Sequence, residues 1–298
     1  MLTSVLLIHH AANGRHDWPP NSLAALRACL EAQARLVEVD IVPLTGGDFA
    51  LLHDRQLGNT TDGVGNVCAM TADQVCRLHY KRNDAVTAEP VGLLSQAVSL
   101  IRHHSLLQEL QLDLKTHAPL TEAVLKDLLR IVAPVKARVR VTSVADWALR
   151  RLYALDRDLP LGFDPLLYLD VAGEVHDEAP TPFRVGAYGY SDDHPLASQR
   201  WGSPADYLSA RAEALWVQSP QVGAWYIRAS LLAQTHKDGF DWIAYLHAHG
   251  VQVDAWTLDT DRPGHTQLAH HLVALGIDRI TTNNATRLAA ALGQGAEF

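Results

Sequence analysis

The sequence predicts an α/β fold, a (β/α)8 TIM barrel with a β-hairpin after strand 2 and a long loop insertion around 171–212. Short, apolar, β-branched runs alternate with longer amphipathic stretches along the 298 residues. This alternation favours a parallel sheet, and eight such units favour its closure into a barrel. The alternative is an open doubly wound sheet. It is less favoured, because no Gly-rich G-x-G-x-x-G turn follows the first strand.

Each element is predicted from its periodicity and its length. Strands are apolar runs of about five residues, and Asn21 or Ser22 is the expected N-cap of the first helix. The predicted barrel strands are Ser4–His9, Leu36–Val42, Leu110–Lys115, Val139–Ser143, Leu159–Phe163, Ala214–Gln218, Gln252–Leu258 and Arg279–Thr282. The predicted helices are Ser22–Ala34, Leu93–His104, Leu120–Ile131, Ala145–Leu155, Asp241–His249 and Thr266–Leu275.

Two segments depart from strict alternation. Pro43–Asp48 is a turn with two glycines, and Phe49–His53 follows it. This connection is too short for a parallel crossover, so a hairpin is predicted. Val171–Ala212 is rich in Pro, Gly, Asp and Tyr and is longer than an ordinary βα loop. It would lie on the C-terminal face of the barrel, either as a lid or as a solvated insertion.

Composition excludes several classes of protein. Hydrophobic residues make up 48% of the chain and charged residues 19%, which excludes a disordered chain and suits a single domain over residues 1–298. The net charge of −8 argues against nucleic-acid binding. The three cysteines suit a reducing compartment, and no run resembles a signal peptide or a membrane span. A cytoplasmic protein with a small-molecule partner is expected, and homo-oligomerisation is left open.

Polar residues gather at the ends of the predicted strands. Glu38 and Asp40 are two positions apart on one strand, so they share a face, and Asp113 and Lys115 repeat this spacing on the next. His9 ends the first strand, and the hairpin returns His53 toward the second. The C-terminal strand ends of a barrel surround one mouth, where catalytic residues are found. All six side chains are therefore expected there.

Three carboxylates around one mouth are costly unless a cation or protons offset them. A hard divalent cation, Mg²⁺ or Ca²⁺, is the expected partner for oxygen ligands. The histidines are then left for acid–base roles, and Lys115 supplies a charge for an anionic substrate. A phosphate ester fits this combination best. Each residue alone could be structural, but together they indicate a site.

These residues also carry a family resemblance. The chain contains IHHAANG, then PPNSLAALRACLEAQARLVEVDIVPLTGGDFALLHDRQLGNTTDGVG, and later LDLK, VTSVA, VDAWTLD and GIDRITTNNA. In this order they resemble the glycerophosphodiester phosphodiesterase signature, within the PLC-like phosphodiesterase superfamily. That signature has His-Arg-Gly, Pro-Glu-Asn-Thr, Glu-x-Asp, His-Asp and Thr-Thr-Asp-Gly, followed by a strand with Glu-x-Lys or Asp-x-Lys. The match extends over residues 8–285.

The resemblance implies a TIM-barrel hydrolase of glycerophosphodiester-like substrates, which releases an alcohol and a phosphomonoester and depends on a divalent cation. It implies acid–base roles for His9 and His53 and phosphate contact by Lys115. Trp256 would form a wall beside the alcohol moiety of the substrate. The implied metal ligands are Glu38, Asp40 and Asp113.

The chain departs from the signature at two positions. His10 stands where the family has Arg, and Pro20 stands where it has Glu. His10 is predicted to contact the phosphate when it is protonated, as a weaker donor than Arg. Arg15 or Arg55 is a candidate replacement for the missing cation. The departures also bring the chain closer to sphingomyelinase-D-like phospholipases, although the cysteine-rich loop of those proteins is absent.

Three alternatives remain open at this stage. The chain could be a phospholipase-D-like lyase or transferase of the same superfamily, with a cyclic phosphate as its product. It could also be a non-catalytic binding protein on the same barrel, although every acid–base and metal position is present. A sugar-processing barrel with two carboxylates would leave Lys115 and His53 without a role.

Overall fold

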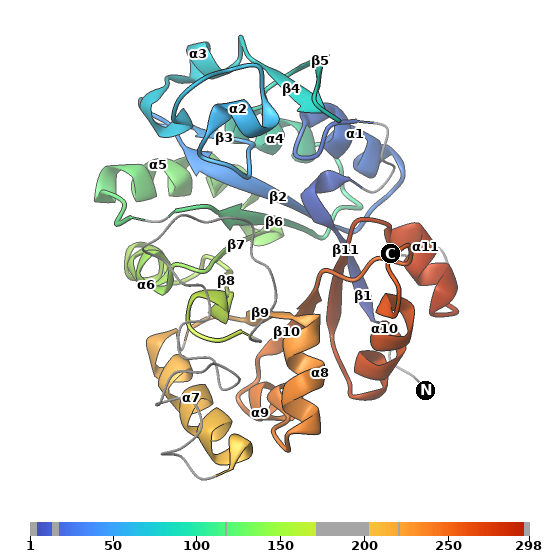
Figure 1. Ribbon diagram of the computed structural model, residues 1–298. Helices are drawn as coiled ribbons and strands as arrows, with labels where there is room; N and C mark the ends of the chain where they lie inside the picture. Colours follow the sequence, from blue (N-terminus) through green and yellow to red (C-terminus); the bar gives the residue numbers. More distant parts are fainter. Residues whose placement is uncertain (1–4, 14–17, 117, 171–202, 220, 295–298) are drawn as a thin grey trace.

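The computed structural model describes residues 5–13, 18–116, 118–170, 203–219 and 221–294. Eight parallel strands close into a barrel in the order β1–β2–β6–β7–β8–β9–β10–β11, with β11 paired again to β1 (Figure 1). The predicted TIM barrel is confirmed. Its strands are β1 (Leu6–His9), β2 (Leu36–Pro43), β6 (Glu109–Leu114), β7 (Val139–Ser143), β8 (Leu161–Phe163), β9 (Ala224–Arg228), β10 (Gln252–Trp256) and β11 (Arg279–Thr282).

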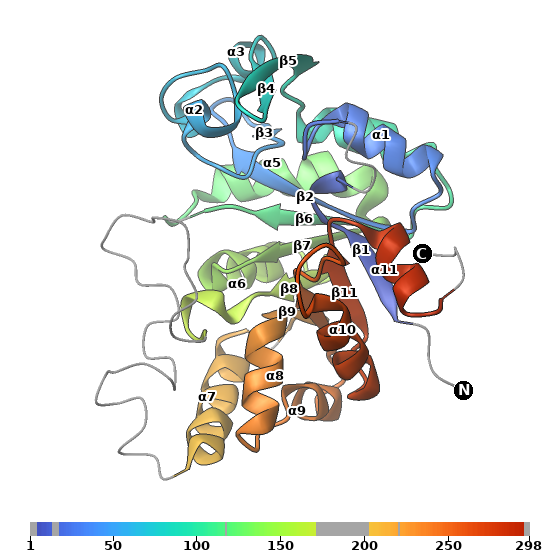
Figure 2. The same cartoon turned by 45° about the vertical axis from the view of Figure 1, so that its right-hand side comes forward.

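Helices surround the barrel, as Figures 1 and 2 show. They are α1 (Leu23–Glu31), α4 (Leu94–Ile101), α5 (Glu122–Val132), α6 (Asp146–Leu155), α7 (Pro204–Gln218), α8 (Ala229–Lys237), α9 (Trp242–Ala248), α10 (His265–Ala274) and α11 (Ala285–Ala291). Short 3-10 turns are η1 (His10–Ala12), η3 (Ala133–Arg138) and η4 (Pro165–Leu167). The main apolar core lies between strands and helices. Ser22 caps α1, since its hydroxyl accepts a hydrogen bond from the Ala25 amide.

A small lobe, residues 49–90, follows β2 and lies to one side of the barrel (Figures 1 and 2). It contains β3 (Phe49–Ala50), α2 (Leu57–Thr60), η2 (Val67–Ala69), α3 (Ala72–Val75), β4 (His79–Arg82) and β5 (Ala85–Pro90). β3 runs antiparallel to β2, which confirms the predicted hairpin. We call residues 49–90 the insertion lobe. It has its own apolar cluster, which includes Val67, Val75 and Tyr80. The β4–β5 hairpin was not predicted.

One predicted strand is wrong. Ala214–Gln218 is the last part of α7, and the sixth barrel strand is β9, ten residues further along. Ser203 and Asp206 form a capping box that starts α7, and Pro204 occupies its first turn. A five-residue apolar run cannot by itself distinguish a strand from the end of a helix. The loop predicted to extend to residue 212 is corrected for the same reason, because α7 begins at Pro204; residues 171–202 lie outside the described ranges.

A buried ionic network lies at the end of the barrel where the strands begin. Arg279, the first residue of β11, is only 2% exposed, and its Nη2 donates to Oε1 of Glu109 at 2.6 Å. Arg140 Nε donates to the other Glu109 oxygen at 3.0 Å. Burial would raise the pKa of Glu109, but the two guanidinium groups outweigh it and lower that pKa. Glu109 therefore stays ionised between two strands that are far apart in the sequence.

Replacing Glu109 by alanine should destabilise the protein by about 3–5 kcal/mol, because it leaves buried guanidinium charge without its carboxylate. Urea unfolding at neutral pH measures this loss. Glu122→Ala is the matched control, since its ion pair with Lys126 is exposed and should matter little. Equal unfolding midpoints for wild type and Glu109→Ala would show that the network does not stabilise the barrel.

Candidate active site

A cavity of about 370 Å³ opens at the C-terminal ends of the barrel strands. This is the end of a TIM barrel where loops and strand ends supply catalytic residues. We call it the first cavity. Its lining combines acidic, basic and aromatic side chains from all eight barrel strands or the segments that follow them: His10, Glu38, His53, Gln111, Asp113, Lys115, Thr142, Val144, Asp164, Leu166, Tyr226, Arg228, Trp256, Thr257 and Thr281.

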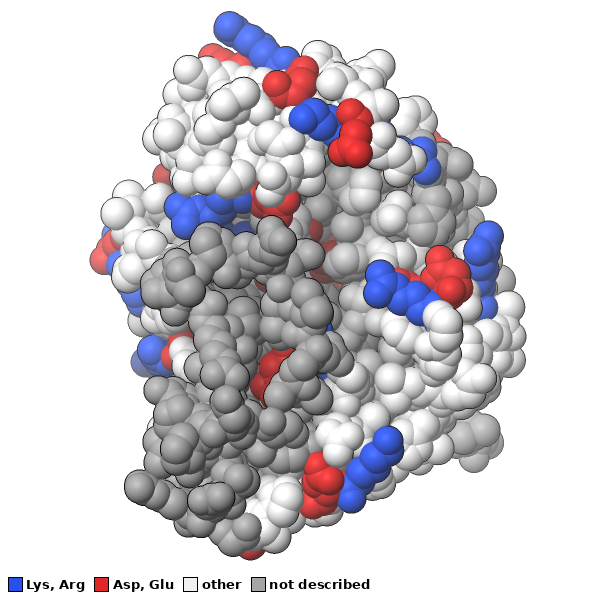
Figure 3. Space-filling model, viewed as in Figure 1, with Lys and Arg blue, Asp and Glu red and all other residues white. Residues whose placement is uncertain are grey.

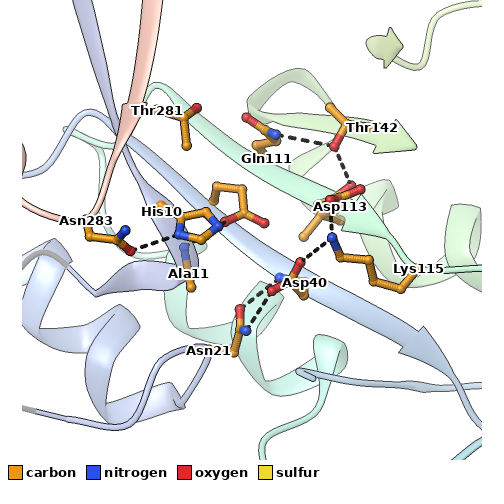
Figure 4. Close-up of polar contacts among 12 residues, drawn as sticks. His10, Ala11, Asn21, Asp40, Gln111, Asp113, Lys115, Thr142, Thr281 and Asn283 are labelled. Atoms are coloured by element: carbon orange, nitrogen blue, oxygen red, sulfur yellow. Dashed lines mark hydrogen bonds and ion pairs between the residues drawn. The ribbon is translucent and has the colours of Figure 1, made fainter. Parts of the chain in front are cut away.

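The predicted carboxylates converge. Glu38, Asp40 and Asp113 each place an oxygen within 4.8 Å of the others, so the three could hold a metal ion. Asp40 and Asp113 stand opposite each other in the β2–β6 register, which explains how two neighbouring strands bring them together. Lys115 Nζ contacts Asp113 Oδ2 at 2.7 Å and Asp40 Oδ1 at 3.1 Å (Figure 4). One ammonium group therefore faces two of the three carboxylates.

Asn21 fixes the orientation of Asp40. Its Nδ2 donates to Asp40 Oδ2 at 2.8 Å, and its Oδ1 accepts from the Asp40 amide at 2.8 Å (Figure 4). Burial would raise the pKa of Asp40, but Lys115, His53 and His10 outweigh it, together with the Asn21 hydrogen bond, and bring that pKa down to about 2. Asp40 is therefore held as a fixed anion. Asn21 is therefore a site residue, although the sequence predicts it only as a helix cap.

Glu38 is held by the turn after β1. Ala11 and Ala12 have φ values of +49° and +52°, a left-handed conformation that costs free energy for residues other than glycine. This turn points the Ala11 amide at Glu38 Oε2, which accepts its hydrogen at 2.6 Å. Burial and the neighbouring Asp40 and Asp113 charges raise the pKa of Glu38 well above its ordinary range. The cluster thus holds more negative charge than its surroundings balance.

His10 has a defined tautomer. Asn283 Nδ2 donates to Asp259 Oδ2 at 2.9 Å, which leaves Asn283 Oδ1 facing His10 Nδ1 at 2.9 Å (Figure 4). An amide oxygen only accepts, so we assign the proton to Nδ1. His10 Nε2 lies 4.0 Å from Glu38 Oε2, and the side chain lines the first cavity. A histidine with a free Nε2 lone pair at this position can accept a proton.

His53 has a matching arrangement with a charged partner. Its Nδ1 lies 2.7 Å from Asp54 Oδ1, and Asn59 Nδ2 donates to the other Asp54 oxygen at 3.1 Å. This hydrogen bond to Asp54 raises the pKa of His53. The side chain is 58% exposed and lines the first cavity, where the hairpin was predicted to place it. The Asp54 hydrogen bond therefore shifts His53 toward its protonated form, in which Nε2–H can donate.

His9 does not line the first cavity. It is 4% exposed, and burial lowers its pKa to about 4, so it is neutral near pH 7. In register it stands opposite Val37, which belongs to the core between strands and helices. Residues opposite each other in a sheet point to the same face, so His9 points away from the barrel interior. The structure thus brings His10, and not His9, together with His53.

A second cavity, of about 500 Å³, lies between the turn after β1 and the insertion lobe. It shares His10 and His53 with the first cavity. Its lining combines apolar, hydroxyl, amide, acidic and basic side chains: His10, Ala11, Asn13, Pro20, Asn21, Asp40, Leu52, His53, Thr60, Tyr80, Lys81, Arg82 and Asn83. His10 and His53, which line both cavities, therefore lie where the two cavities meet.

Two charged residues that line the first cavity, Arg228 and Asp164, were not predicted from the sequence. Arg228 is the last residue of β9, and its guanidinium carbon lies 4.9 Å from the ring centre of Trp256, the residue to which the family resemblance gives the role of an aromatic wall. Asp164 follows β8, and burial raises its pKa well above the ordinary range. Of the cations suggested as replacements for the missing arginine, Arg55 lines neither cavity, and Arg15 lies outside the described residues.

Among the described residues, no helix combines the length and apolar character needed to cross a membrane.

Comparison with known proteins shows the family of the chain. The model of the glycerophosphoryl diester phosphodiesterase family matches residues 9–287. Glycerophosphodiester phosphodiesterase 1 of Homo sapiens is 28% identical over 255 residues, which cover 83% of this chain and 70% of that protein. The Mus musculus protein of the same name is 37% identical over 120 residues, or 39% of this chain, and the chain spans only about a third (35%) of its length.

Solved structures share the fold. A phosphodiesterase from Oleispira antarctica, in complex with the product sn-glycerol-3-phosphate, superposes with a TM-score of 0.65 at 19% identity and 97% coverage of both chains. A glycerophosphodiester phosphodiesterase from Parabacteroides distasonis gives a TM-score of 0.67 at 16% identity, again with 97% coverage of both. Because the family model matches nearly the whole length, the chain belongs to the glycerophosphoryl diester phosphodiesterase family.

Proposed function

We propose that the protein is a metal-dependent phosphodiesterase that hydrolyses glycerophosphodiesters to an alcohol and a phosphomonoester. The observation that carries the proposal is the placement of two histidines with oriented rings, His10 and His53, beside a carboxylate cluster and a lysine in one cavity. Family membership supports the same reaction. We further propose that residues 1–298 form a single phosphodiesterase domain and that the protein is cytoplasmic.

Glu38, Asp40 and Asp113 would hold the divalent cation, as the sequence predicted. Three carboxylate oxygens within 4.8 Å suit a hard ion, and a cation there would offset both the burial and the neighbouring carboxylates that raise the pKa of Glu38. When bound, Mg²⁺ or Ca²⁺ would polarise the phosphoryl oxygens and offset their negative charge. Lys115, already between two of these carboxylates, would contact a phosphate oxygen.

His10 and His53 would divide the proton transfers. His10, with its proton on Nδ1, accepts the proton of the attacking hydroxyl at Nε2. The new oxygen–phosphorus bond forms as the bond to the leaving alcohol breaks, and His53 donates a proton to the departing oxygen. The partners of the two rings favour this assignment. Asp54 is a carboxylate and stabilises protonated His53, whereas Asn283 is an amide and adds no charge beside His10. It replaces His9 by His10 in the role first predicted from the sequence, so the phosphate contact expected of His10 is not part of the proposal.

The proposed hydrolase and its main alternative, a lyase-like enzyme, differ in the hydroxyl group that attacks the phosphorus atom. Water as the nucleophile yields the phosphomonoester directly, whereas a neighbouring hydroxyl of the substrate yields a cyclic phosphate and makes the protein lyase-like. Phosphorus NMR of the products separates the two reactions. A cyclic phosphate that accumulates without further hydrolysis would contradict the hydrolase proposal.

The proposal is tested by assaying glycerophosphocholine, lysophosphatidylcholine and a simple aryl phosphodiester with and without EDTA. We expect hydrolysis of the glycerophosphodiester that EDTA abolishes and that Mg²⁺ or Ca²⁺ restores. Full activity in EDTA would contradict the metal requirement. Complete inactivity with every substrate and ion would favour a non-catalytic binding protein on this barrel.

Asp54→Asn should shift the alkaline limb of the kcat/KM profile to lower pH. Protonated His53 is the proposed acid, and its hydrogen bond to Asp54 raises its pKa, so activity persists to higher pH in the wild type. Asp62→Asn is the matched control, because Asp62 pairs with His79 at 3.5 Å in the insertion lobe. An alkaline limb that stays in place in Asp54→Asn would contradict the role of His53 as the acid.

A further inference from the structure

The two cavities meet at the proposed acid–base pair. Glu38, Asp113 and Lys115 line the first cavity, Asp40 lines the second, and His10 and His53 line both. A phosphodiester carries two alcohol groups on one phosphorus atom. A phosphorus atom beside the carboxylate cluster would therefore direct one alcohol group into each cavity. The second cavity, at about 500 Å³, is within the size range of small-molecule sites.

The second cavity is lined as a polar binding site. Asn13, Asn21 and Asn83 contribute amides, whereas Pro20 and Leu52 contribute apolar surface. In addition, the Thr60 hydroxyl is buried and has no hydrogen-bond partner among the described residues. A buried hydroxyl without a partner costs free energy, which a ligand with polar groups would recover.

Two cations stand on the hairpin side of this cavity. Lys81 and Arg82 end β4, and a two-residue turn with left-handed φ at Asn83 (+49°) and Asp84 (+63°) joins β4 to β5. Such a turn fixes the geometry of a hairpin. Lys81 Nζ donates to the Gly58 carbonyl at 2.9 Å, which orients the ammonium group and leaves two of its protons for other acceptors.

The sign of charge differs along the second cavity. Asp40, which shares Lys115 with Asp113, lies at the end near the histidines, whereas the hairpin end presents Lys81 and Arg82. Asp84, on the same turn, does not line the cavity. Figure 3 shows basic beside acidic side chains on the outer surface of the insertion lobe, so the surface as a whole has no single sign. Within the second cavity, the basic side chains lie at the hairpin end.

We propose that the second cavity binds the alcohol group of a substrate that carries an anionic group, a carboxylate or a second phosphate, which Lys81 and Arg82 contact. This inference rests on the proposed phosphodiesterase function and specifies its substrate class. The insertion lobe then selects the substrate, and the barrel supplies the chemistry. The anionic group can belong to a small glycerophosphodiester or to a lipid headgroup.

The test uses two substrates that differ by one carboxylate, glycerophosphoserine and glycerophosphoethanolamine. We expect wild type to prefer the serine ester in kcat/KM by about 3- to 10-fold, mainly through KM, as for a partly exposed charge contact. Lys81→Gln and Arg82→Gln should each reduce this preference ratio, and the double variant should bring it close to 1. Lys126→Gln, an exposed lysine on α5, is the control and should keep the wild-type ratio.

The same pair of headgroups on lysophospholipids identifies the source of the anionic group. A serine preference confined to the lysophospholipids assigns a lipid headgroup, and one confined to the glycerol esters assigns a small soluble substrate. Equal hydrolysis of both headgroups by wild type, with ratios that the variants do not change, overturns this inference and leaves the phosphodiesterase proposal standing. Absence of hydrolysis of every ester in Mg²⁺ or Ca²⁺ overturns both.

Discussion

His10→Ala is expected to lower kcat by about 10²- to 10⁴-fold, the scale for loss of a positioned acid or base. The reason is geometric, since His10 lines the cavity beside the carboxylate cluster with its Nε2 turned toward Glu38 and its Nδ1 held by Asn283. The metal affinity should change little, because His10 is not one of the three clustered carboxylates. Steady-state kinetics, together with calorimetry of the same preparation, measures both quantities.

His9→Asn is the matched comparison, one residue earlier in the chain. His9 is buried and points away from the barrel interior, so its replacement should lower the melting temperature and leave kcat per folded molecule within about tenfold of wild type. The reverse result, a large loss in His9→Asn and a small one in His10→Ala, would restore the role predicted from the sequence. The kcat of Asn283→Ala should lie between those of the two histidine variants, because this substitution removes only the group that orients His10.

The doublet His9–His10 shows what a strand pattern can and cannot specify. The sequence indicates that a histidine ends the first strand, but the inward face depends on where the strand ends and the turn begins. β1 ends at His9, and the left-handed residues Ala11 and Ala12 redirect the chain so that His10 faces the cavity. Two consecutive alanines with positive φ are not a pattern that sequence rules anticipate, because only glycine adopts this conformation freely.

The carboxylates and Lys115 were predictable because the carboxylates lie on regular strands and Lys115 directly follows β6. Alternation along β2 and β6 fixes the faces of Glu38, Asp40, Asp113 and Lys115 without any knowledge of the tertiary structure. Asn283 was not predictable in this way. It meets His10 across 273 residues of sequence, a contact that exists only because β11 closes the barrel against β1.

Arg228 was missed for a different reason. The apolar run at the end of α7 was interpreted as the sixth strand, so the true strand β9 and the arginine at its end received no role. The error left the number of strands unchanged and therefore left the barrel prediction intact. The predicted fold class depends on the number of strands, which stays the same when one segment is taken for another. A predicted site residue depends instead on where one particular strand ends.

The largest loss of metal binding is expected when a carboxylate of the cluster becomes a neutral amide. Glu38→Gln, Asp40→Asn and Asp113→Asn should each weaken Mg²⁺ and Ca²⁺ binding by at least about 10²-fold, more than the loss of an outer partner of a metal ligand. They should lower kcat/KM by about 10²- to 10³-fold or more, since charge stabilisation at the phosphate is lost. Titration calorimetry and kinetics at saturating ion measure the two effects.

The melting temperature distinguishes loss of a metal ligand from loss of the folded structure. In EDTA, the Glu38→Gln variant should melt no lower than wild type, because it relieves repulsion among carboxylates that already raises the pKa of Glu38. Asp164→Asn is the control for the chemical change itself, since Asp164 lines the same cavity, lies outside the cluster, and asparagine preserves the cap on the Leu166 amide. Equal loss of metal affinity in Asp164→Asn, or wild-type affinity in all three cluster variants, would show that the cation binds elsewhere.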